Sequence, residues 1–265
     1  PVWQASSDTG RVSLLGSVLL AFPEVYPLRD AIMQRFAQAD ALVVELDITG
    51  QGALEIQRLM LRDGVLAGGE TLEQHLSAEV WQDLLRYLDQ QALPVEQLIR
   101  LKPGLLATTL STLRLVEYGM QPEHGIDRYF LASANDKLPV IELESAAEQV
   151  GLLLDFPDPD LLLAQTLQQL DDMETLIEPL YQAWLAGDAE ALNQLLLVED
   201  RDNYPQFEVI YQRMFDQRNR AMTRRLIELL ATGDDYFVVV GAGHLVGEEG
   251  IIALLQRAGF AVSRF

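Results

Sequence analysis

Apolar residues along the chain fall into short continuous runs and into longer stretches that repeat with helical spacing. The short runs predict buried strands, which lie at residues 11–20, 41–47, 137–143, 236–241 and 260–264. Helical spacing begins after the first run with Leu28, Ile32 and Phe36, which follow one another on one helix face. Because strands alternate with helices, the pattern predicts an α/β (α+β) fold with a mixed central β-sheet flanked by many helices.

Glycine and proline divide the rest of the chain into segments. Residues 50–69 are rich in glycine, which favours a hairpin or irregular turns. Helical patterns occupy the other connections, at residues 71–120, 125–136, 158–232 and 250–258. The segment at about 158–232 is an insert between the third and fourth core strands. We therefore expect a single domain over residues 1–265 that carries a helical insert.

Two pairs of strand ends resemble each other. The sequence LLGSVL at 14–19 is similar to VVGAGH at 239–244, and VVELD at 43–47 is similar to VIELE at 140–144. Such similarity is typical of an internal duplication of strand–turn units. Short apolar strands also match one another by chance, so both explanations stay open at this point.

The chain is strongly acidic, with 40 Asp and Glu against 19 Lys and Arg residues and a net charge of -21. A phosphate backbone would be repelled, and no basic stripe offsets this charge, so nucleic acid is not expected as a partner. No uninterrupted apolar run reaches the roughly 18 residues that a membrane span needs. The absence of cysteine excludes disulfides, thiolate nucleophiles and sulfur-ligated zinc.

The three histidines lie in different patterns. His75 is among polar helical residues and is expected at the surface, and His124 is in a turn, where a capping or surface role is expected. His244 follows a buried strand and the glycine-containing turn 241–243, at the strand end where open α/β sheets bind ligands. Neutral imidazole is a common metal ligand and general base, which makes His244 the candidate functional histidine. The alternative is a residue that caps the next helix or packs at the sheet edge.

Charged residues within apolar segments are the next candidates. Glu45 lies in the buried run at 41–47, and a buried carboxylate needs an arginine, several hydrogen bonds or a metal. Glu142 and Glu144 alternate along the third strand and are expected to point to one face. A structural salt bridge is the alternative for each glutamate. Arg218 could pair with such a carboxylate or hold a substrate carboxylate, or it could be an ordinary exposed helix arginine.

Common catalytic motifs are absent from the sequence. There is no Gly-x-Ser-x-Gly elbow, no phosphate-binding glycine loop and no His-Glu-x-x-His helix. Serine-hydrolase and nucleotide-binding functions are therefore not favoured.

Several segments together resemble one known family. They are LLGSVLLAFPEVYPLRDAI, ADALVVELD, GIDRYFLASA, LPVIELESAAEQ, RNRAM and, most specifically, VVVGAGHLVGEEGIIALLQRAGFAV. These segments run over nearly the whole chain, which resembles the TraB/GumN family, a relative of the Tiki peptidases. The resemblance implies a metal-dependent enzyme with two Gly-x-x-His motifs and a strand glutamate near the metal.

The family pattern can be carried over residue by residue. Residues 241–244 match the second Gly-x-x-His motif, and Glu45 matches the strand glutamate. Glu144 and Gln149, in LPVIELESAAEQ, match the family's second acidic stretch. Arg218 and Asn219, in RNRAM, match its Arg-Asn pair. The first motif departs from the pattern, because Leu19 stands where the family has its first histidine.

The resemblance implies roles for these residues. His244 and Glu45 would be metal ligands, with Leu19 at the position of the missing ligand, and Glu45, Glu144, Arg218 and Asn219 would serve catalysis. The cofactor would be a divalent transition metal (Mn, Co or Zn), which this chain would hold weakly or not at all because a catalytic site prefers at least three protein ligands. The resemblance thus implies a hydrolase of peptide or protein substrates, impaired in this chain.

A second function on the same fold is a non-catalytic protein that binds a peptide or a signalling ligand. The missing histidine favours it, and the helical insert could form a groove. The chain begins at Pro1 rather than methionine, so a leader peptide could have been removed. With the resemblance, this leads us to expect a periplasmic or secreted protein, with the cytoplasm as the alternative. The sequence does not indicate an oligomeric state.

Overall fold

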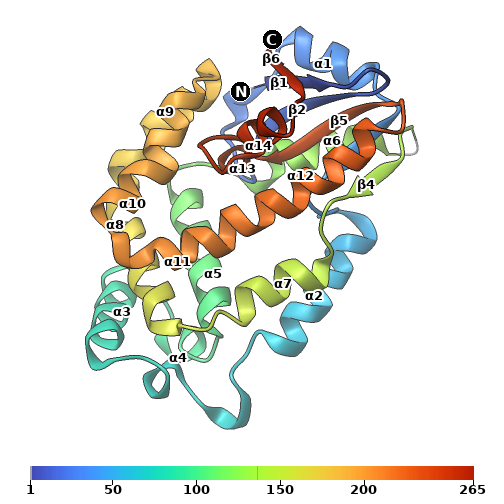
Figure 1. The fold of residues 1–265 in the computed structure, drawn as a ribbon. Helices are drawn as coiled ribbons and strands as arrows, with labels where there is room; N and C mark the ends of the chain where they lie inside the picture. The colour runs from blue at the N-terminus through green and yellow to red at the C-terminus, as the bar shows by residue number, and fades with distance from the viewer. Residues whose placement is uncertain (1, 136) are drawn as a thin grey trace. The chain divides into compact units, whose positions relative to one another are not determined.

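The computed structural model describes residues 2–135 and 137–265, and the strands of this part form one mixed sheet (Figure 1). The sheet order is β4-β3-β5-β2-β1-β6. The strands are β1 (Val2–Ser6), β2 (Arg11–Ser17), β3 (Ala41–Val44), β4 (Val140–Glu142), β5 (Asp235–Gly241) and β6 (Ala261–Arg264). Together with the many helices, this confirms the predicted α/β class with a mixed central sheet.

The centre of the sheet is parallel. β5 lies between β2 and β3 and runs parallel to both, and β3 also runs parallel to β4. β1 pairs with β2 and β6 in antiparallel fashion. The carboxyl ends of β2, β3, β4 and β5 therefore meet at one edge of the sheet, where parallel sheets bind their ligands.

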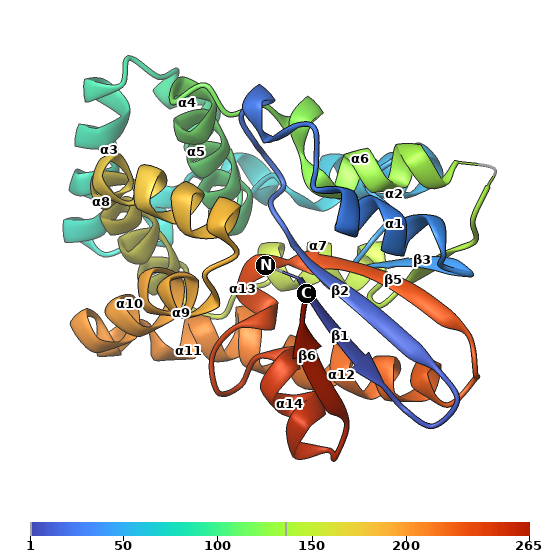
Figure 2. The ribbon, with the colours of Figure 1, turned by 90° about the horizontal axis from the view of Figure 1, so that it is seen from above.

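Helices cover both faces of this sheet. Figure 2 shows α1 (Asp30–Ala37) and α6 (Ile126–Ala134) over one face, with α12 (Gln217–Leu230) and α14 (Ile251–Arg257) over the other. The core on the first face contains three phenylalanines, Phe36 of α1, Phe130 of α6 and Phe237 of β5, whose ring centroids are 4.9–5.5 Å apart. This apolar packing fixes the central strands, and thereby the side chains at their ends.

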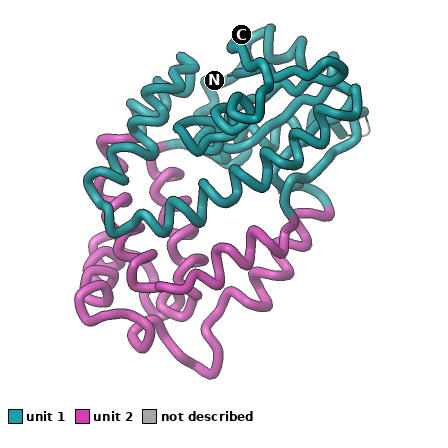
Figure 3. The backbone as a smooth tube through the Cα atoms, viewed as in Figure 1, with its two compact units in different colours: residues 1–50, 119–144, 177–265 teal, residues 51–118, 145–176 magenta. Residues whose placement is uncertain are grey.

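The chain forms two compact units, which Figure 3 shows in different colours. Unit 1 comprises Pro1–Gly50, Gly119–Glu144 and Ile177–Phe265, and it contains the sheet. Besides the four sheet-covering helices, it holds the last part of α8 (Pro159–Ala186), α9 (Ala189–Asn193), α10 (Glu199–Asn203), α11 (Glu208–Tyr211) and α13 (Ala242–Leu245). The expectation of a single domain stays a prediction.

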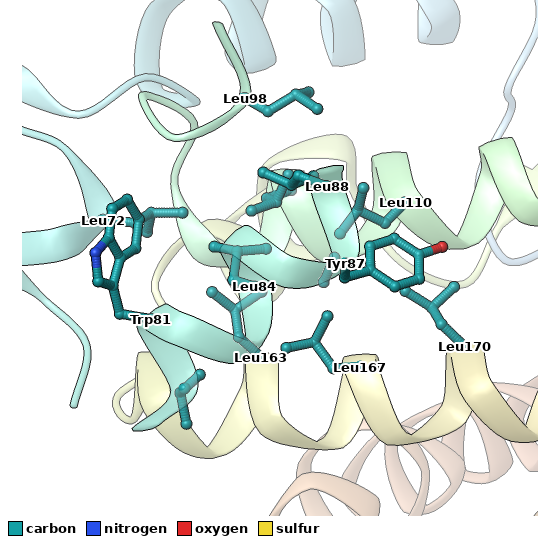
Figure 4. Close-up of a cluster of buried hydrophobic side chains, with 13 residues drawn as sticks. Leu72, Trp81, Leu84, Tyr87, Leu88, Leu98, Leu110, Leu163, Leu167 and Leu170 are labelled. Atoms are coloured by element: carbon teal, nitrogen blue, oxygen red, sulfur yellow. The ribbon is translucent and has the colours of Figure 1, made fainter. Parts of the chain in front are cut away.

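Unit 2 is helical and has a core of its own. It comprises Gln51–Tyr118 and Ser145–Leu176, with most of α2 (Gly50–Asp63), then α3 (Ala78–Gln90), α4 (Val95–Leu98), α5 (Pro103–Glu117), α7 (Ala146–Leu154) and the first part of α8. Figure 4 shows its buried cluster, to which Leu84, Leu110 and Leu163 contribute fully buried side chains from three helices.

The glycine-rich stretch at 50–69 is not a hairpin, and that prediction was wrong. Most of it is α2, which spans Gly50–Asp63. Its glycines are confined to the first turn, and the sequence ALEIQRLMLRD that follows consists mainly of strong helix formers. The glycines of this stretch therefore lie at the start of α2 and after its end, and they do not form a hairpin.

Two elements were not predicted. β1 lies in a terminal stretch without a long apolar run, and its pairing with β2 and β6 makes it a strand. α7 begins after Ser145, which forms a capping box with Glu148, and this pattern is visible in the sequence. In the described part of the chain, no helix is both long and apolar enough to cross a membrane.

The similar strand ends are neighbours in the sheet. β2 pairs with β5 and β3 pairs with β4. In the sheet, Ser17 lies opposite Gly241. The sequence similarity instead pairs Gly16 with Gly241, so the two alignments differ by one residue. An internal duplication stays a prediction.

Candidate functional site

The candidate residues converge at the edge where the parallel strands end, within unit 1. Glu45 directly follows β3, Glu144 lies two residues after β4, and His244 lies in α13 after the end of β5. Arg218 and Asn219 are in the first turn of α12. Residues from four distant parts of the sequence therefore form one cluster.

Glu45 is the acceptor at the centre of the cluster. Its Oε1 accepts a hydrogen bond of 2.6 Å from the backbone N–H of Gly241, and its Oε2 accepts one of 2.6 Å from Arg218. Burial by itself raises the pKa of Glu45, but the charge of Arg218, that of His244 when protonated, and these hydrogen bonds hold it below its usual value. Glu45 is therefore an ionised carboxylate whose side chain is only 17% exposed.

Arg218 joins two carboxylates. Its Nε and Nη2 donate to the two oxygens of Glu144 at 2.7 and 2.6 Å, in the forked geometry that suits a carboxylate, and Nη2 also reaches Glu45. Its Nη1 donates to the carbonyl of Met214 at 3.1 Å. Burial alone would lower the pKa of Arg218, but the hydrogen bonds and charges of the two glutamates raise it. The guanidinium thus remains charged.

His244 is buried and oriented by Asn219. Its Nδ1 lies 2.6 Å from Asn219 Oδ1, while the amide nitrogen of Asn219 donates to the carbonyl of Glu249 at 2.9 Å. The amide oxygen therefore accepts from Nδ1–H, which leaves Nε2 as the unprotonated nitrogen. Nε2 lies 3.8 Å from Glu45 Oε2. Burial lowers the pKa of His244, and the positive charge of Arg218 lowers it further. The negative charges of Glu45 and Glu144 act in the opposite direction, but the pKa stays below its usual value, so the imidazole is neutral at pH 7.

The glycine before His244 allows a close aromatic contact. A Cβ atom on Gly243 would lie 2.8 Å from Cε1 of Phe215, which is too close for any side chain. The ring of Phe215 lies 5.2 Å from the imidazole of His244, centroid to centroid. The motif glycine therefore lets the imidazole pack under an aromatic ring that restricts its rotation.

The first-motif turn follows β2 beside this cluster. Ser17 is paired with Gly241 in the sheet, so the turns after β2 and β5 begin side by side. The Gly16 carbonyl accepts from Trp184 Nε1 at 2.8 Å, and the Val18 carbonyl accepts from the Ile126 N–H at 3.0 Å. Leu19 follows with 61% of its surface exposed.

Asp127, in the first turn of α6, is a site residue that the sequence analysis missed. Its Oδ1 accepts from Ser17 Oγ at 3.0 Å, whereas its Oδ2 is buried and has no partner in the described structure. Burial, reinforced by the negative charge of Glu45, raises the pKa of Asp127 to about 7. The only sequence signal was an acid at the start of an apolar helix, which is a common position for solvent-exposed capping acids.

Other candidates have separate environments. His75 lies 2.9 Å from Glu70, and His124 accepts through its backbone carbonyl from Tyr26. Glu142 accepts from the backbone N–H of Asp47 at 2.8 Å, whereas Glu144 binds Arg218. β4 ends at Glu142, so Glu144 lies outside the strand, and the expectation that the two glutamates share one face stays a prediction.

The donors present do not complete a catalytic metal site. Two donors bound to one ion at about 2.1 Å lie about 3–4 Å apart, and His244 Nε2 with Glu45 Oε2 meets this at 3.8 Å. However, no group of three or more His, Cys, Asp and Glu side chains among the described residues is arranged to hold a metal. The same Glu45 oxygen binds Arg218, and Leu19 offers no donor.

Comparison with known proteins identifies the family. The model of the TraB/PrgY/gumN family matches residues 1–264. This chain belongs to the TraB/PrgY/gumN family. Among its relatives, an uncharacterised protein YbaP of Escherichia coli (strain K12) is 29% identical over 246 residues, which cover 92% of this chain and 87% of the relative. The YbaP protein of Shigella flexneri matches to the same extent.

A more distant relative of this TraB/PrgY/gumN chain carries a function in its name. A metalloprotease TIKI homolog of Amphimedon queenslandica is 31% identical over 81 residues, which cover 30% of this chain and 13% of the relative. No solved structure matches the chain. The family resemblance predicted from the sequence is therefore confirmed, while the likeness to a metalloprotease covers only part of the chain.

Proposed function

We propose that this chain carries the frame of a metal-dependent hydrolase of peptide or protein substrates, with catalysis impaired by Leu19. The observation that carries the proposal is the 3.8 Å approach of the neutral, Asn219-oriented Nε2 of His244 to the ionised Oε2 of Glu45. The partial likeness to a metalloprotease TIKI homolog supports the reaction class. Export to the periplasm or out of the cell is part of the same proposal.

The residues of the chain would divide the work as follows. His244 and Glu45 would present one nitrogen and one oxygen donor of the kind that Mn²⁺, Co²⁺ or Zn²⁺ accepts. Asn219 would keep the His244 Nε2 lone pair directed at the site. Arg218 would hold Glu45 and Glu144 in place and offset part of their charge. If a third ligand completed the site, His244 and Glu45 would help to hold a metal, which would supply Lewis-acid activation of water and of the scissile carbonyl.

The test restores the missing ligand. Leu19→His should bind Mn²⁺, Co²⁺ or Zn²⁺ on the order of tenfold or more tightly than the unchanged chain, because it adds a third protein donor. Isothermal titration calorimetry measures the affinity. Leu19→Ala is the matched control and should gain nothing, since it removes bulk without adding a donor. The Leu19→His, His244→Ala double variant should lose the gain.

The functional readout is peptide cleavage. A screen of unstructured peptides, with and without each metal, should show cleavage by Leu19→His that exceeds cleavage by the unchanged chain. If Leu19→His binds all three metals no better than Leu19→Ala, position 19 is not a ligand position and the hydrolase proposal is wrong.

A second function is favoured by the ion pairs of Arg218. This residue already gives both Glu45 and Glu144 an ion-pair partner in the absence of a metal. Such a site suits a non-catalytic protein that binds a peptide or a signalling ligand. Saturable peptide binding by the unchanged chain, equal with and without chelator and without turnover even in Leu19→His, would favour this function.

A further inference from the structure

A cavity lined in part by Asn219 adjoins the candidate site. Its volume is about 290 Å³, and its lining residues belong to the segment around α9–α10, the start of α12 and the loop after α13, all within unit 1. The apolar part of the cavity wall consists of Leu197, Val198 and Val246. The volume is enough for one or two amino-acid residues, at the lower end of ligand pockets.

Two interrupted helices build the wall of this cavity. The residues Gln194–Val198 and Gln212–Asp216 are π-helical turns, and each contributes side chains to the lining. Such turns are rare and are often found at functional sites, because they displace side chains from the regular helical positions. Gly247, with φ of +83°, closes the loop, and a Cβ atom there would lie 2.7 Å from Asn193 Oδ1.

The cavity presents polar groups that are not used by the protein. Arg201 donates to Asp216 at 2.9 Å, so this lining cation is already paired. Among the described residues, the side chains of Asn193 and Glu248 form no hydrogen bond or ion pair. A ligand here would therefore meet an amide and a carboxylate.

Charge selects the kind of ligand. The lining contains Asp216, Glu248 and Glu249 against Arg201 as the one cationic side chain. Asp216 is neutralised by Arg201, and Glu249 by Arg220 and Arg257, which leaves Glu248 unbalanced at the exposed rim. The net charge of -21 also attracts cations to the molecule. An ammonium group on the ligand matches this arrangement.

We propose that the cavity binds a peptide segment that carries an ammonium group. Glu248 would accept from the ammonium, and the side-chain amide of Asn193 would bind the peptide backbone. The proposal rests on the proposed function in taking a peptide as the ligand. Asn219 lines the cavity and is hydrogen-bonded to His244 at 2.6 Å, so a ligand in the cavity would change the environment of the His244 imidazole.

Binding is tested by calorimetry on the unchanged chain with three probes. These are dialanine amide with a free amino terminus, N-acetyl-lysine methylamide, and the neutral N-acetyl-alanine methylamide. At least one ammonium-bearing probe should bind more tightly than the neutral probe, and comparison of the first two decides between a terminal and a side-chain ammonium. No binding by either ammonium probe, or equal binding of all three, would overturn the proposal.

Matched variants separate the cavity from general charge attraction. Glu248→Gln should weaken the binding of the ammonium probe about three- to fivefold, as expected for one partly exposed ion pair. Glu190→Gln removes the same charge from an exposed position of α9 outside the cavity lining and should leave binding unchanged. Equal weakening by both variants would show non-specific attraction and overturn the proposal.

The three histidines provide an internal readout. In nuclear magnetic resonance spectra, a saturating ammonium probe should shift the imidazole signals of His244, through Asn219, and leave those of His75 and His124 in place. Probe binding with no selective change at His244 would place the ligand elsewhere and overturn the proposal. Because these tests use the unchanged chain without metal, their failure is distinguishable from failure of Leu19→His to bind metal.

Discussion

At the scale of single residues, Asp127 shows how burial changes a carboxyl group. Ser17 satisfies one of its oxygens, and the other is buried without a partner beside the negative Glu45. Both effects favour the protonated form, which explains a pKa of about 7. The folded protein therefore binds a proton at Asp127 over a pH range in which the unfolded chain has released it.

Asp127 makes folding stability depend on pH. Because its pKa is raised from 3.8 to about 7, its contribution is fully present below pH 3.8 and is lost as pH rises towards 7. Asp127→Asn keeps an oxygen that can accept from Ser17 and removes the titration. Relative to the unchanged chain, this variant should gain stability between pH 5 and pH 8, by on the order of 1–3 kcal/mol.

Urea unfolding at pH 5 and pH 8 measures this difference. Asp8→Asn is the control, because Asp8 is exposed and its removal should leave the pH dependence unchanged. If Asp127→Asn and the unchanged chain lose stability in parallel from pH 5 to pH 8, Asp127 is not protonated in the folded state.

At the scale of secondary-structure elements, Arg218 connects α12 to the ends of β3 and β4. The side chains of Arg218, Glu45 and Glu144 are 15%, 17% and 11% exposed, so the charges depend on one another rather than on water. In such buried groups the loss of one partner costs more than the pair itself contributes, because a charge is left uncompensated. The helix is thereby tied to the sheet edge that carries the candidate site.

Arg218→Met should destabilise the protein at pH 7 by about 3–5 kcal/mol, because two buried carboxylates lose their partner. The deficit should shrink as pH falls through the range in which glutamates take up protons, since neutral carboxyl groups need no counterion. Urea unfolding at pH 7 and pH 4.5 tests both statements. The control is Arg220→Met on the same helix. Because the side chain of Arg220 is 55% exposed, this variant should lower the free energy of unfolding by less than about 1 kcal/mol. Similar losses in both variants would contradict the buried-pair interpretation.

At the scale of the whole molecule, the excess of acidic residues governs which macromolecules can approach. The net charge is -21, and Arg201, Arg218 and Arg220 of unit 1 are paired with acids. Binding to a phosphate backbone needs a set of cations that releases the counterions of the nucleic acid. We therefore expect the chain to bind cationic peptides rather than nucleic acids.

No binding of a fluorescent 20-base-pair DNA duplex is expected at physiological salt. Lowering the salt concentration should not produce binding, because the dominant force between two polyanions is repulsion. Fluorescence anisotropy measures this directly. Saturable binding that strengthens at low salt would reveal a basic surface and contradict the prediction.

Much of the fold could be predicted from the sequence because its signals are local. Apolar runs predicted the central strands, and helical spacing predicted the covering helices. β1 was missed because its strand state depends on pairing with β2 and β6, and α2 because glycines at its start outweighed the helix formers that follow. For the site, the turn before His244 and the acid in an apolar strand at Glu45 were visible in the sequence.

By itself the sequence determined the family and the alternation of the central strands with helices, because each is a property of neighbouring residues, and it placed Leu19 where the family resemblance implies a histidine. Only the tertiary structure decided that Arg218 pairs with Glu144 and Glu45, which are 74 and 173 residues away. It also decided that Asp127 is buried beside Glu45 and that Asn219 separates His244 from a cavity. The physical reason is that burial and charge pairing depend on which distant segments the sheet brings to one edge.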